Sequence, residues 1–272
     1  MTASEVPLSG GDVTEGVVRV GATVRRPRQA FSGSVAAYLR HLEAAGFSGA
    51  PRWHGVDDQG RDVLDFVVGE VPGSPPPAWT AGDTVLAEIG RLLRRLHDAS
   101  EGFVAPAGAV WFGDDIVVPL PADARIDDPP ELVTHLDVTP QNVVFRVGRP
   151  VALIDFDMTR PATRLIDIVN TAMHWVPLQH PDDRAKIHSR GDIPARLRLF
   201  VDAYGIDEGD RHRLLDVAAR AFRRSWYRMR ANALQRGGGW ARMWDEGVGD
   251  KIARRQAWLA TQHDALTEAL LR

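Results

Sequence analysis

The sequence predicts an α+β fold in two lobes, a small antiparallel-sheet lobe over residues 1–69 and a larger, mainly helical lobe over residues 70–272. Three observations predict this class. Short β-branched runs separated by turn residues occupy the first part, and apolar residues at helical spacing occupy most of the second. Between them lies a proline-rich connector, EVPGSPPPAWT (residues 70–80), whose composition favours neither helix nor strand.

The first lobe is expected to run β-β-α-β-β with mostly antiparallel pairing. Residues 17–26 (VVRVGATVRR) predict a tight hairpin, because two β-branched runs flank the glycine of a Gly-Ala turn. Residues 34–45 predict a helix that Ser34 can cap and Gly46 can end. The runs PRWHGVD and RDVLDFVVG, separated by the turn DQG, predict two more strands.

In the second lobe, Thr80 and Asp83 resemble a capping box at the start of the first helix. The segments VVFRV and VALIDF predict a short strand pair joined by GRP. The segment ARAFRRSWYRMR (residues 219–230) is the most basic, and we interpret it as a solvated arginine-rich face. Apolar residues recur at helical spacing over residues 81–97, 165–175, 194–204, 211–233 and 250–271.

Composition excludes several classes of protein. The net charge of −3 indicates no nucleic-acid partner, and the absence of cysteine excludes disulfides and thiolate metal sites. No run approaches the ~18 apolar residues that a membrane-spanning helix needs. The N-terminal MTASEVPLSGGD lacks the apolar core of a signal peptide. We therefore expect a cytoplasmic protein with no membrane partner.

The candidate chemistry lies in THLDVTPQNVVF (residues 134–145) and LIDFD (residues 153–157). Asp137 falls in an irregular turn, Asn142 at the start of one predicted strand and Asp155 at the end of the next. If the two strands pair, Asn142 and Asp155 come close together. We interpret His135 as a hydrogen-bonded packing residue.

These groups make an oxygen-only site, which suits Mg²⁺. Mg²⁺ completes its shell with phosphate oxygens, so the site points to a nucleotide triphosphate. Asp137 could accept the proton of a hydroxyl nucleophile. A metal-dependent hydrolase that uses His135, Asp137, Asp155 and Asp157 is an alternative, but the sequence has no histidine-rich cluster to support it.

The motif HLDVTPQN followed by LIDFD resembles the catalytic core of the aminoglycoside phosphotransferase family, kinase-like enzymes that phosphorylate small molecules. The resemblance implies a two-lobed protein-kinase-like fold, also similar to choline kinases. It implies that Asp137 is the catalytic base and that Asn142 and Asp155 hold Mg²⁺. Asp157 would bind a second metal or its water shell, or cap the chain locally. The segment RLIDIV implies that Asp167 braces the catalytic loop.

The resemblance also implies where a nucleotide binds. The segment SGGDVTEGVVRV is similar to the hairpin loop that covers the nucleotide in this family, and VLDFVVGEVPG is similar to the strand that links the lobes. The implied nucleotide-binding residues are Gly10, Gly11, Arg25, Arg26, Asp65, Phe66 and Val67.

Two departures from the family concern the first lobe. The only lysines are Lys186 and Lys251, so the lysine that reaches the nucleotide phosphates in the family is absent. Arg25 or Arg26 must replace it; strand alternation turns only one of them inward, and Arg26 is favoured. The glutamate that pairs with this lysine in the family is not evident either. Glu43 is the only acidic residue of the predicted helix over residues 34–45, and it lies late in that helix.

The sequence therefore predicts transfer of the γ-phosphoryl group of ATP or GTP, with Mg²⁺, to a hydroxyl of a small antibiotic or metabolite. The alternative is a pseudokinase-like module that binds nucleotide without turnover, which the missing lysine favours. Residues 181–272 contain 18 Lys/Arg and 13 Asp/Glu, which argues against a polycationic aminoglycoside as acceptor. Trp175, Trp240 and Trp244 are candidates for stacking on a ligand.

Overall fold

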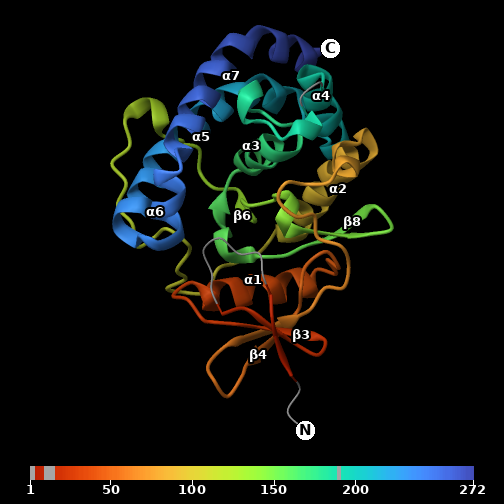
Figure 1. Ribbon diagram of the computed structural model, residues 1–272, viewed down its shortest axis with the longest axis vertical. Helices are drawn as coiled ribbons and strands as arrows, with labels where there is room; N and C mark the ends of the chain where they lie inside the picture. The colour runs from red at the N-terminus through yellow and green to blue at the C-terminus, as the bar shows by residue number, and fades with distance from the viewer. Residues whose placement is uncertain (1–3, 9–15, 189–190) are drawn as a thin grey trace.

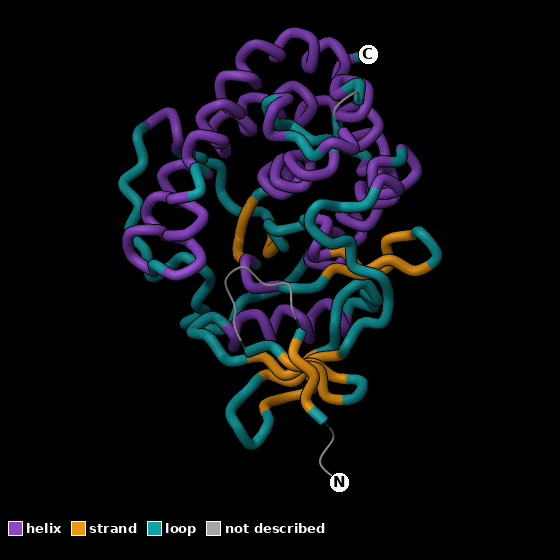
Figure 2. Tube along the Cα trace, in the orientation of Figure 1, coloured by secondary structure: helices purple, strands orange, loops and turns teal. Residues whose placement is uncertain are grey.

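The computed structural model describes residues 4–8, 16–188 and 191–272, and it has the predicted α+β fold. A small antiparallel sheet forms one end of the molecule and a group of helices forms the other (Figure 1). The helix α1 (Ser32–Ala44) lies between them (Figure 2). Gly10 and Gly11 lie outside the described residues.

The first lobe is built on a five-stranded antiparallel sheet with the strand order β1-β2-β3-β5-β4. The predicted hairpin is confirmed, with Val18 opposite Arg25, and Gly21 turns it at φ +63°. The strands are β1 (Glu5–Pro7), β2 (Val18–Val20), β3 (Thr23–Arg26), β4 (Trp53–Val56) and β5 (Asp62–Asp65).

Two details of this lobe differ from the prediction. The short edge strand β1 was not expected; it pairs with β2, with Glu5 opposite Val20. Ser34 does not cap α1, because the helix already begins at Ser32. The Ser34 hydroxyl instead accepts a hydrogen bond from the backbone N–H of Val110 at 3.0 Å, which joins α1 to the second lobe.

The second lobe confirms all five predicted helices and the VVFRV–VALIDF hairpin. Its helices are α2 (Asp83–Ser100), α3 (Arg164–Trp175), α4 (Ile193–Tyr204), α5 (Glu208–Arg236), α6 (Gly238–Asp245) and α7 (Val248–Leu271). Its strands are β6 (Leu132–Thr134), β7 (Val143–Arg146), β8 (Arg149–Leu153) and β9 (Arg160–Ala162). Short 3₁₀ helices span Ala78–Ala81, Ala122–Ala124, Pro140–Asn142, Phe156–Met158, Pro181–Asp183 and Lys186–His188.

Sequence reasoning missed α6 and the β6–β9 pair, whose three-residue strands are too short to show a period. The proposed capping box is wrong: Gly82 occupies the N-cap of α2, and the Thr80 hydroxyl donates to the carbonyl oxygen of Pro77 at 2.7 Å. The connector is also less irregular than predicted. Glu70 and Phe145 exchange two backbone hydrogen bonds of 2.8 and 2.7 Å, which fasten the connector to β7.

One hydrophobic core runs through the second lobe and takes in the inner face of α1. Tyr38 and Leu42 of α1 are fully buried against it. The Tyr38 hydroxyl donates to the carbonyl oxygen of Val133 at 3.0 Å, just before the loop that carries Asp137. This contact fixes the first lobe directly against the candidate site. Among the described residues, no helix is both long and apolar enough to span a membrane.

Candidate active site

The loop between β6 and β7 carries two of the predicted site residues and is closed by a contact between them. The side-chain Nδ2 of Asn142 donates to the Asp137 backbone oxygen at 2.9 Å and to its Oδ2 at 2.7 Å. Leu136, next to Asp137, adopts a left-handed conformation with φ +60°, which is strained for a residue with a side chain. The loop therefore needs strong support from its surroundings.

Asp167 of α3 supplies that support from a fully buried position. Its Oδ1 accepts the Leu136 backbone N–H at 3.1 Å, and its Oδ2 accepts hydrogen bonds from the Thr134 hydroxyl and from His97 Nε2, the latter at 3.1 Å. Burial alone would raise the pKa of Asp167, but the hydrogen bonds from His97 and Thr134 outweigh burial and hold it below its usual value. An ionised Asp167 thus lies where the resemblance places the brace.

His135 supports the same loop from the other side. Burial lowers the pKa of His135, so the ring is neutral at pH 7. Its Nε2 lies 3.0 Å from the Ile154 carbonyl oxygen and must carry the proton, because a carbonyl can only accept. Its Nδ1 then accepts the Asp137 backbone N–H at 3.3 Å. His135 is therefore a packed, hydrogen-bonded residue, in agreement with the expectation from sequence.

The hairpin β7–β8 brings Asp155 beside Asn142. Val143 faces Leu153 in the hairpin, and the backbone N–H of Ile154 donates to the Asn142 carbonyl oxygen at 2.9 Å. Asp155 follows directly and adopts φ +62°, an uncommon conformation for aspartate that often marks a ligand-binding position. The proximity that the predicted strand pair required is present in the structure.

Arg26 of β3 reaches across from the first lobe to the carboxylates of Asp155 and Asp157. Its Nη2 donates to Asp155 Oδ1 at 2.9 Å and also to Asp157 Oδ2. Burial disfavours the Arg26 charge, but the two carboxylates outweigh burial and raise the pKa of Arg26. One cationic nitrogen is thus held by both carboxylates at the junction of the lobes.

Arg25 points elsewhere, as strand alternation requires. Its Nη1 donates to the Thr23 hydroxyl at 2.5 Å, and its Nε lies 3.5 Å from Asp57 Oδ2. Glu43 forms an ion pair with Arg52 at 3.2 Å, whereas Arg26 pairs with Asp155 and Asp157. Of the two candidate arginines, therefore, Arg26 contacts the second lobe and Arg25 stays within the first.

The environment of Asp137 suits a general base. Burial, followed by the negative charge of Asp155, raises the pKa of Asp137 to about 7, although the hydrogen bond from Asn142 opposes the rise. A carboxylate with a pKa near neutrality accepts a proton far more readily than an ordinary aspartate does.

The donor groups here fit Mg²⁺. Asp155 and Asp157 already hold one cationic nitrogen between them, and the amide nitrogen of Asn142 is engaged by Asp137, which leaves its oxygen as the ligand atom. No group of three or more histidine, aspartate or glutamate side chains in the described part of the chain could hold a metal. Water and phosphate oxygens would therefore have to complete the coordination shell.

The predicted nucleotide-binding residues of the strand that links the lobes, Asp65, Phe66 and Val67, do not lie beside Asp155 and Asp157. Asp65 Oδ1 lies 2.6 Å from His54 Nε2, and the Phe66 ring lies 3.8 Å beneath the Arg19 guanidinium. Neither of the two pockets that Asp155 lines includes Asp65, Phe66 or Val67. Any contact of these residues with a nucleotide would lie away from the aspartates.

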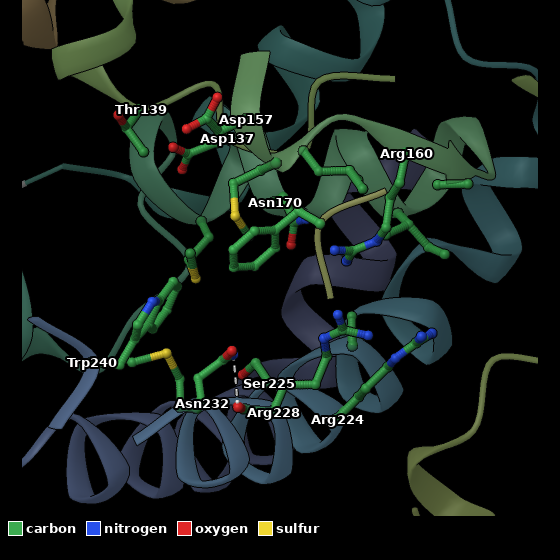
Figure 3. A pocket seen from close by; sticks show the side chains of 18 of the residues that line it. Asp137, Thr139, Asp157, Arg160, Asn170, Arg224, Ser225, Arg228, Asn232 and Trp240 are labelled. Carbon is green, nitrogen blue, oxygen red and sulfur yellow. Dashed lines mark hydrogen bonds between the residues drawn. The ribbon is translucent and has the colours of Figure 1, made fainter. Parts of the chain in front are cut away.

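A cavity of about 900 Å³ opens from the aspartates into the second lobe. Asp137 and Asp157 lie at one end of it, and residues of β9 and α5 lie across from them (Figure 3). Of the three candidate tryptophans, Trp240 lines the cavity, whereas Trp175 is buried in the core and Trp244 packs on Trp226. The cavity also contains five arginines, namely Arg160, Arg224, Arg228, Arg236 and Arg255.

Sequence reasoning missed these arginines, and the solvated face that it expected on ARAFRRSWYRMR is only partly correct. Arg223 is exposed and pairs with Asp123, whereas Arg224 and Arg228 turn into the cavity. The spacing of four residues between Arg224 and Arg228 was the available signal, since it places both on one side of a helix.

Comparisons with known proteins show the family and the fold. The sequence model of the phosphotransferase enzyme family matches residues 111–200. The trifolitoxin immunity protein of Rhizobium leguminosarum bv. trifolii is 33% identical over 221 residues, which cover 78% of each chain.

Solved structures share the fold at low sequence identity. A choline/ethanolamine kinase family protein from Mesorhizobium loti superposes with a TM-score of 0.62 at 18% identity, over 99% of this chain and 93% of that one. A microcompartment-associated aminopropanol kinase gives 0.58 at 15% identity, over 99% and 94%. An amicoumacin kinase in complex with AMP-PNP, Ca²⁺ and its antibiotic gives 0.56 at 13% identity, over 96% and 88%. The chain therefore has the two-lobed fold of small-molecule kinases.

Proposed function

The chain belongs to the phosphotransferase enzyme family, and from that premise we propose that it transfers the γ-phosphoryl group of ATP or GTP, with Mg²⁺, to a hydroxyl of a small molecule. One observation carries the proposal: Asp137, Asn142 and Asp155 converge at one end of a cavity large enough for a small acceptor. Phosphoryl transfer needs mainly positioning and charge stabilisation, which these groups supply.

Each residue has a distinct role in this proposal. Asn142, Asp155 and Asp157 would hold Mg²⁺, which when bound neutralises charge on the phosphate oxygens. Asp137 orients the acceptor hydroxyl and takes its proton as the oxygen attacks phosphorus. With a pKa of about 7, a large fraction of Asp137 is ionised near neutral pH, and the carboxylate is basic enough to take the proton of a hydroxyl.

Arg26 takes the place of the missing lysine. We infer that its guanidinium leaves Asp155 and Asp157 when the metal–nucleotide complex enters, and turns to the phosphates, which it can bind through two parallel hydrogen bonds. Gly10 and Gly11 would cover the phosphates, and the chain at Asp65, Phe66 and Val67 would bind the base. The AMP-PNP complex of the amicoumacin kinase, which shares the fold, supports a nucleotide in the cleft.

The acceptor is proposed to be an antibiotic, a toxin or a hydroxylated metabolite. The immunity function in the name of the 33% identical relative supports a role in resistance. We propose that the reaction takes place in the cytoplasm, where ATP and Mg²⁺ are plentiful.

A second candidate function is a nucleotide-binding module without turnover. The observation that favours it is the ion pairing of Arg26 with Asp155 and Asp157, which occupies the two carboxylates needed for the metal. Against it stands Asp137, because a module without turnover has no use for a base of that pKa.

Two assays on purified protein test these proposals. Calorimetric titration with ATP and GTP, with and without Mg²⁺, measures binding; release of ADP or GDP across a panel of hydroxylated antibiotics and metabolites measures turnover. Mg²⁺-dependent binding with release for at least one acceptor is expected. Binding without release for any acceptor would favour the module, and no binding of either nucleotide would exclude both functions.

A further inference from the structure

Three arginines lie together at the end of the cavity opposite Asp137 and Asp157. Arg160 comes from β9, and Arg224 and Arg228 come from successive turns of α5. The guanidinium groups of Arg160 and Arg228 face one another, with Arg224 beside them, and Asn170 lies between this group and Asp137 (Figure 3). We call Arg160, Arg224 and Arg228 the arginine cluster.

Among the described residues, the cluster has no counter-charge in direct contact. The buried Nη1 of Arg160 and Nε of Arg224 have no hydrogen-bond partner. In the part of the chain that the structure describes, no carboxylate lies within ion-pair distance of any cluster arginine. The nearby Asp114 attracts Arg160 and Arg228 only at longer range, while its own Oδ2 accepts the Trp111 N–H at 2.8 Å.

This arrangement is electrostatically unfavourable in the unliganded protein. Burial, followed by the charges of Arg228 and Arg224, lowers the pKa of Arg160 to about 9. Burial, followed by the charge of Arg224, likewise lowers the pKa of Arg228 to about 10. Like charges packed together out of water destabilise a fold unless something neutralises them.

Two other arginines nearby have carboxylate partners within the chain. Arg236, which lines the same cavity, pairs with Asp115 at 2.5 Å and donates to Asn232 Oδ1 at 2.9 Å. Arg223, adjacent to Arg224 in sequence, pairs with Asp123 on the outside of α5. Arg236 and Arg223 thus have carboxylate partners, whereas the described residues supply none for the three arginines of the cluster, nor for Arg255, which also lines the cavity.

Part of the remaining cavity wall is apolar. Phe112 and Trp240 stack at 5.8 Å with an interplanar angle of 30°, and both line the cavity. The Trp240 Nε1 is buried and has no hydrogen-bond partner. Met229 and Met243 also line the cavity, with side chains that adapt to varied shapes.

We infer that the acceptor is an anion: a hydroxylated small molecule with an oxyanion group, carboxylate or phosphate, bound by the arginine cluster. Its apolar part would lie against Phe112 and Trp240, and its hydroxyl would reach Asp137. Arginine suits this role because its planar group binds oxyanions through two parallel hydrogen bonds. The inference rests on the proposed function only in taking this cavity as the acceptor site.

Binding of simple anions to the nucleotide-free protein tests the inference independently of turnover. The probes are 3-phenyllactate, which carries a ring, a hydroxyl and a carboxylate, its neutral amide 3-phenyllactamide, and inorganic phosphate. We expect 3-phenyllactate to raise the Tm of the protein and to bind at least ~10-fold more tightly than the amide, the scale of one charge-assisted hydrogen bond. Phosphate acting without 3-phenyllactate would identify a phosphate-bearing acceptor instead.

Arg224→Gln and Arg228→Gln are the test variants, and Arg223→Gln is the matched control on the outer face of α5. The test variants should lose the anion-dependent rise in Tm, while the control should keep it. Without anion, each test variant should melt at a higher temperature than wild type, because a buried like charge has been removed.

Two results would overturn the inference. One is that neither anion raises the Tm of wild type more than that of the test variants. The other is a lower Tm of both test variants without anion, which would make the cluster a structural element. Failure of the proposed function would look different: anion binding would persist while ADP release was absent.

Discussion

At the scale of single residues, burial and neighbouring charged or hydrogen-bonding groups set the pKa of each aspartate in the site. Burial and the charge of Asp155 raise the pKa of Asp137, whereas the pKa of Asp167, which is more deeply buried, is lowered by its hydrogen bonds from His97 and Thr134. Two aspartates thirty residues apart thus acquire opposite properties, one suited to accept a proton and the other to hold a loop.

Asp137→Asn should abolish turnover and leave nucleotide binding nearly intact. The amide preserves the shape that Asn142 contacts but cannot take a proton, so kcat should fall by ~10²–10⁴. Steady-state kinetics with calorimetry on the same sample decide the matter. If the variant retained more than about a tenth of the wild-type kcat, Asp137 would not be the base.

The pH dependence of turnover should report the raised pKa of Asp137. Because the base acts when deprotonated, kcat/KM should rise with pH through about 7 and level off above it. In kcat at saturating Mg²⁺ and nucleotide, the midpoint should move to lower pH, since the metal offsets the charge of Asp155. A profile flat between pH 5 and 8 would mean that no base of this pKa limits the reaction.

Arg25→Ala and Arg26→Ala should differ sharply. Arg26 contacts Asp155 and Asp157, so its loss should raise the KM for nucleotide and lower kcat by at least ~10-fold, the scale of one lost charge-assisted contact. Arg25 contacts Thr23 and Asp57, so Arg25→Ala should leave both kcat and the KM for nucleotide near their wild-type values. Equal, near-wild-type kinetics for the two variants would show that backbone and metal alone hold the phosphates.

At the scale of elements, the candidate site is held together by short irregular segments fixed to long regular ones. The loop after β6 is bound to α3 through Asp167 and to the end of β8 through His135. Trp175 of α3 adds a hydrogen bond of 2.7 Å from Nε1 to the Val138 carbonyl oxygen. A strained loop can keep one geometry because rigid elements hold it on several sides.

Asp167→Ala should destabilise the whole protein and inactivate it. It leaves the Leu136 N–H, the Thr134 hydroxyl and the His97 ring buried without their acceptor, which should cost on the order of 3 kcal/mol of unfolding free energy. Urea unfolding measures the change. Asp98→Ala, which removes an exposed partner of Arg94, is the control and should stay near wild type; equal losses in the two variants would contradict the bracing role.

At the scale of the molecule, the two lobes meet through opposite charges. Arg26 of the first lobe pairs with Asp155 and Asp157 of the second, and α1 of the first lobe is built into the core of the second. The Arg26 guanidinium therefore lies between the lobes, next to the two carboxylates. The large cavity of the second lobe begins at the same carboxylates.

Asp155→Ala should remove Mg²⁺-dependent nucleotide affinity and activity together. Asn142→Ala should act in the same direction but more weakly, because a neutral amide attracts a cation less than a carboxylate does. Titrating ATP against each variant with and without Mg²⁺ gives the comparison. An unchanged effect of Mg²⁺ on ATP binding in Asp155→Ala would contradict the metal assignment.

The sequence by itself determined the class of fold and the proximity of Asp137, Asn142 and Asp155. Hydrophobic periodicity and turn residues predicted the helices and hairpins, because these depend on contacts near in sequence. The positions of Asp137, Asn142 and Asp155 followed from one local hairpin, whose register is fixed by its short turn.

Only the tertiary structure decided which charges meet across the chain. Arg26 and Asp155 stand 129 residues apart, and Arg160 faces Arg228 from a different element. Arg223 and Arg224 are neighbours in sequence, yet one is exposed beside Asp123 and the other lies in the cavity, because a helix turns successive side chains to different sides. The sequence does not show whether a charge is solvated or buried, because that depends on the elements that pack around it.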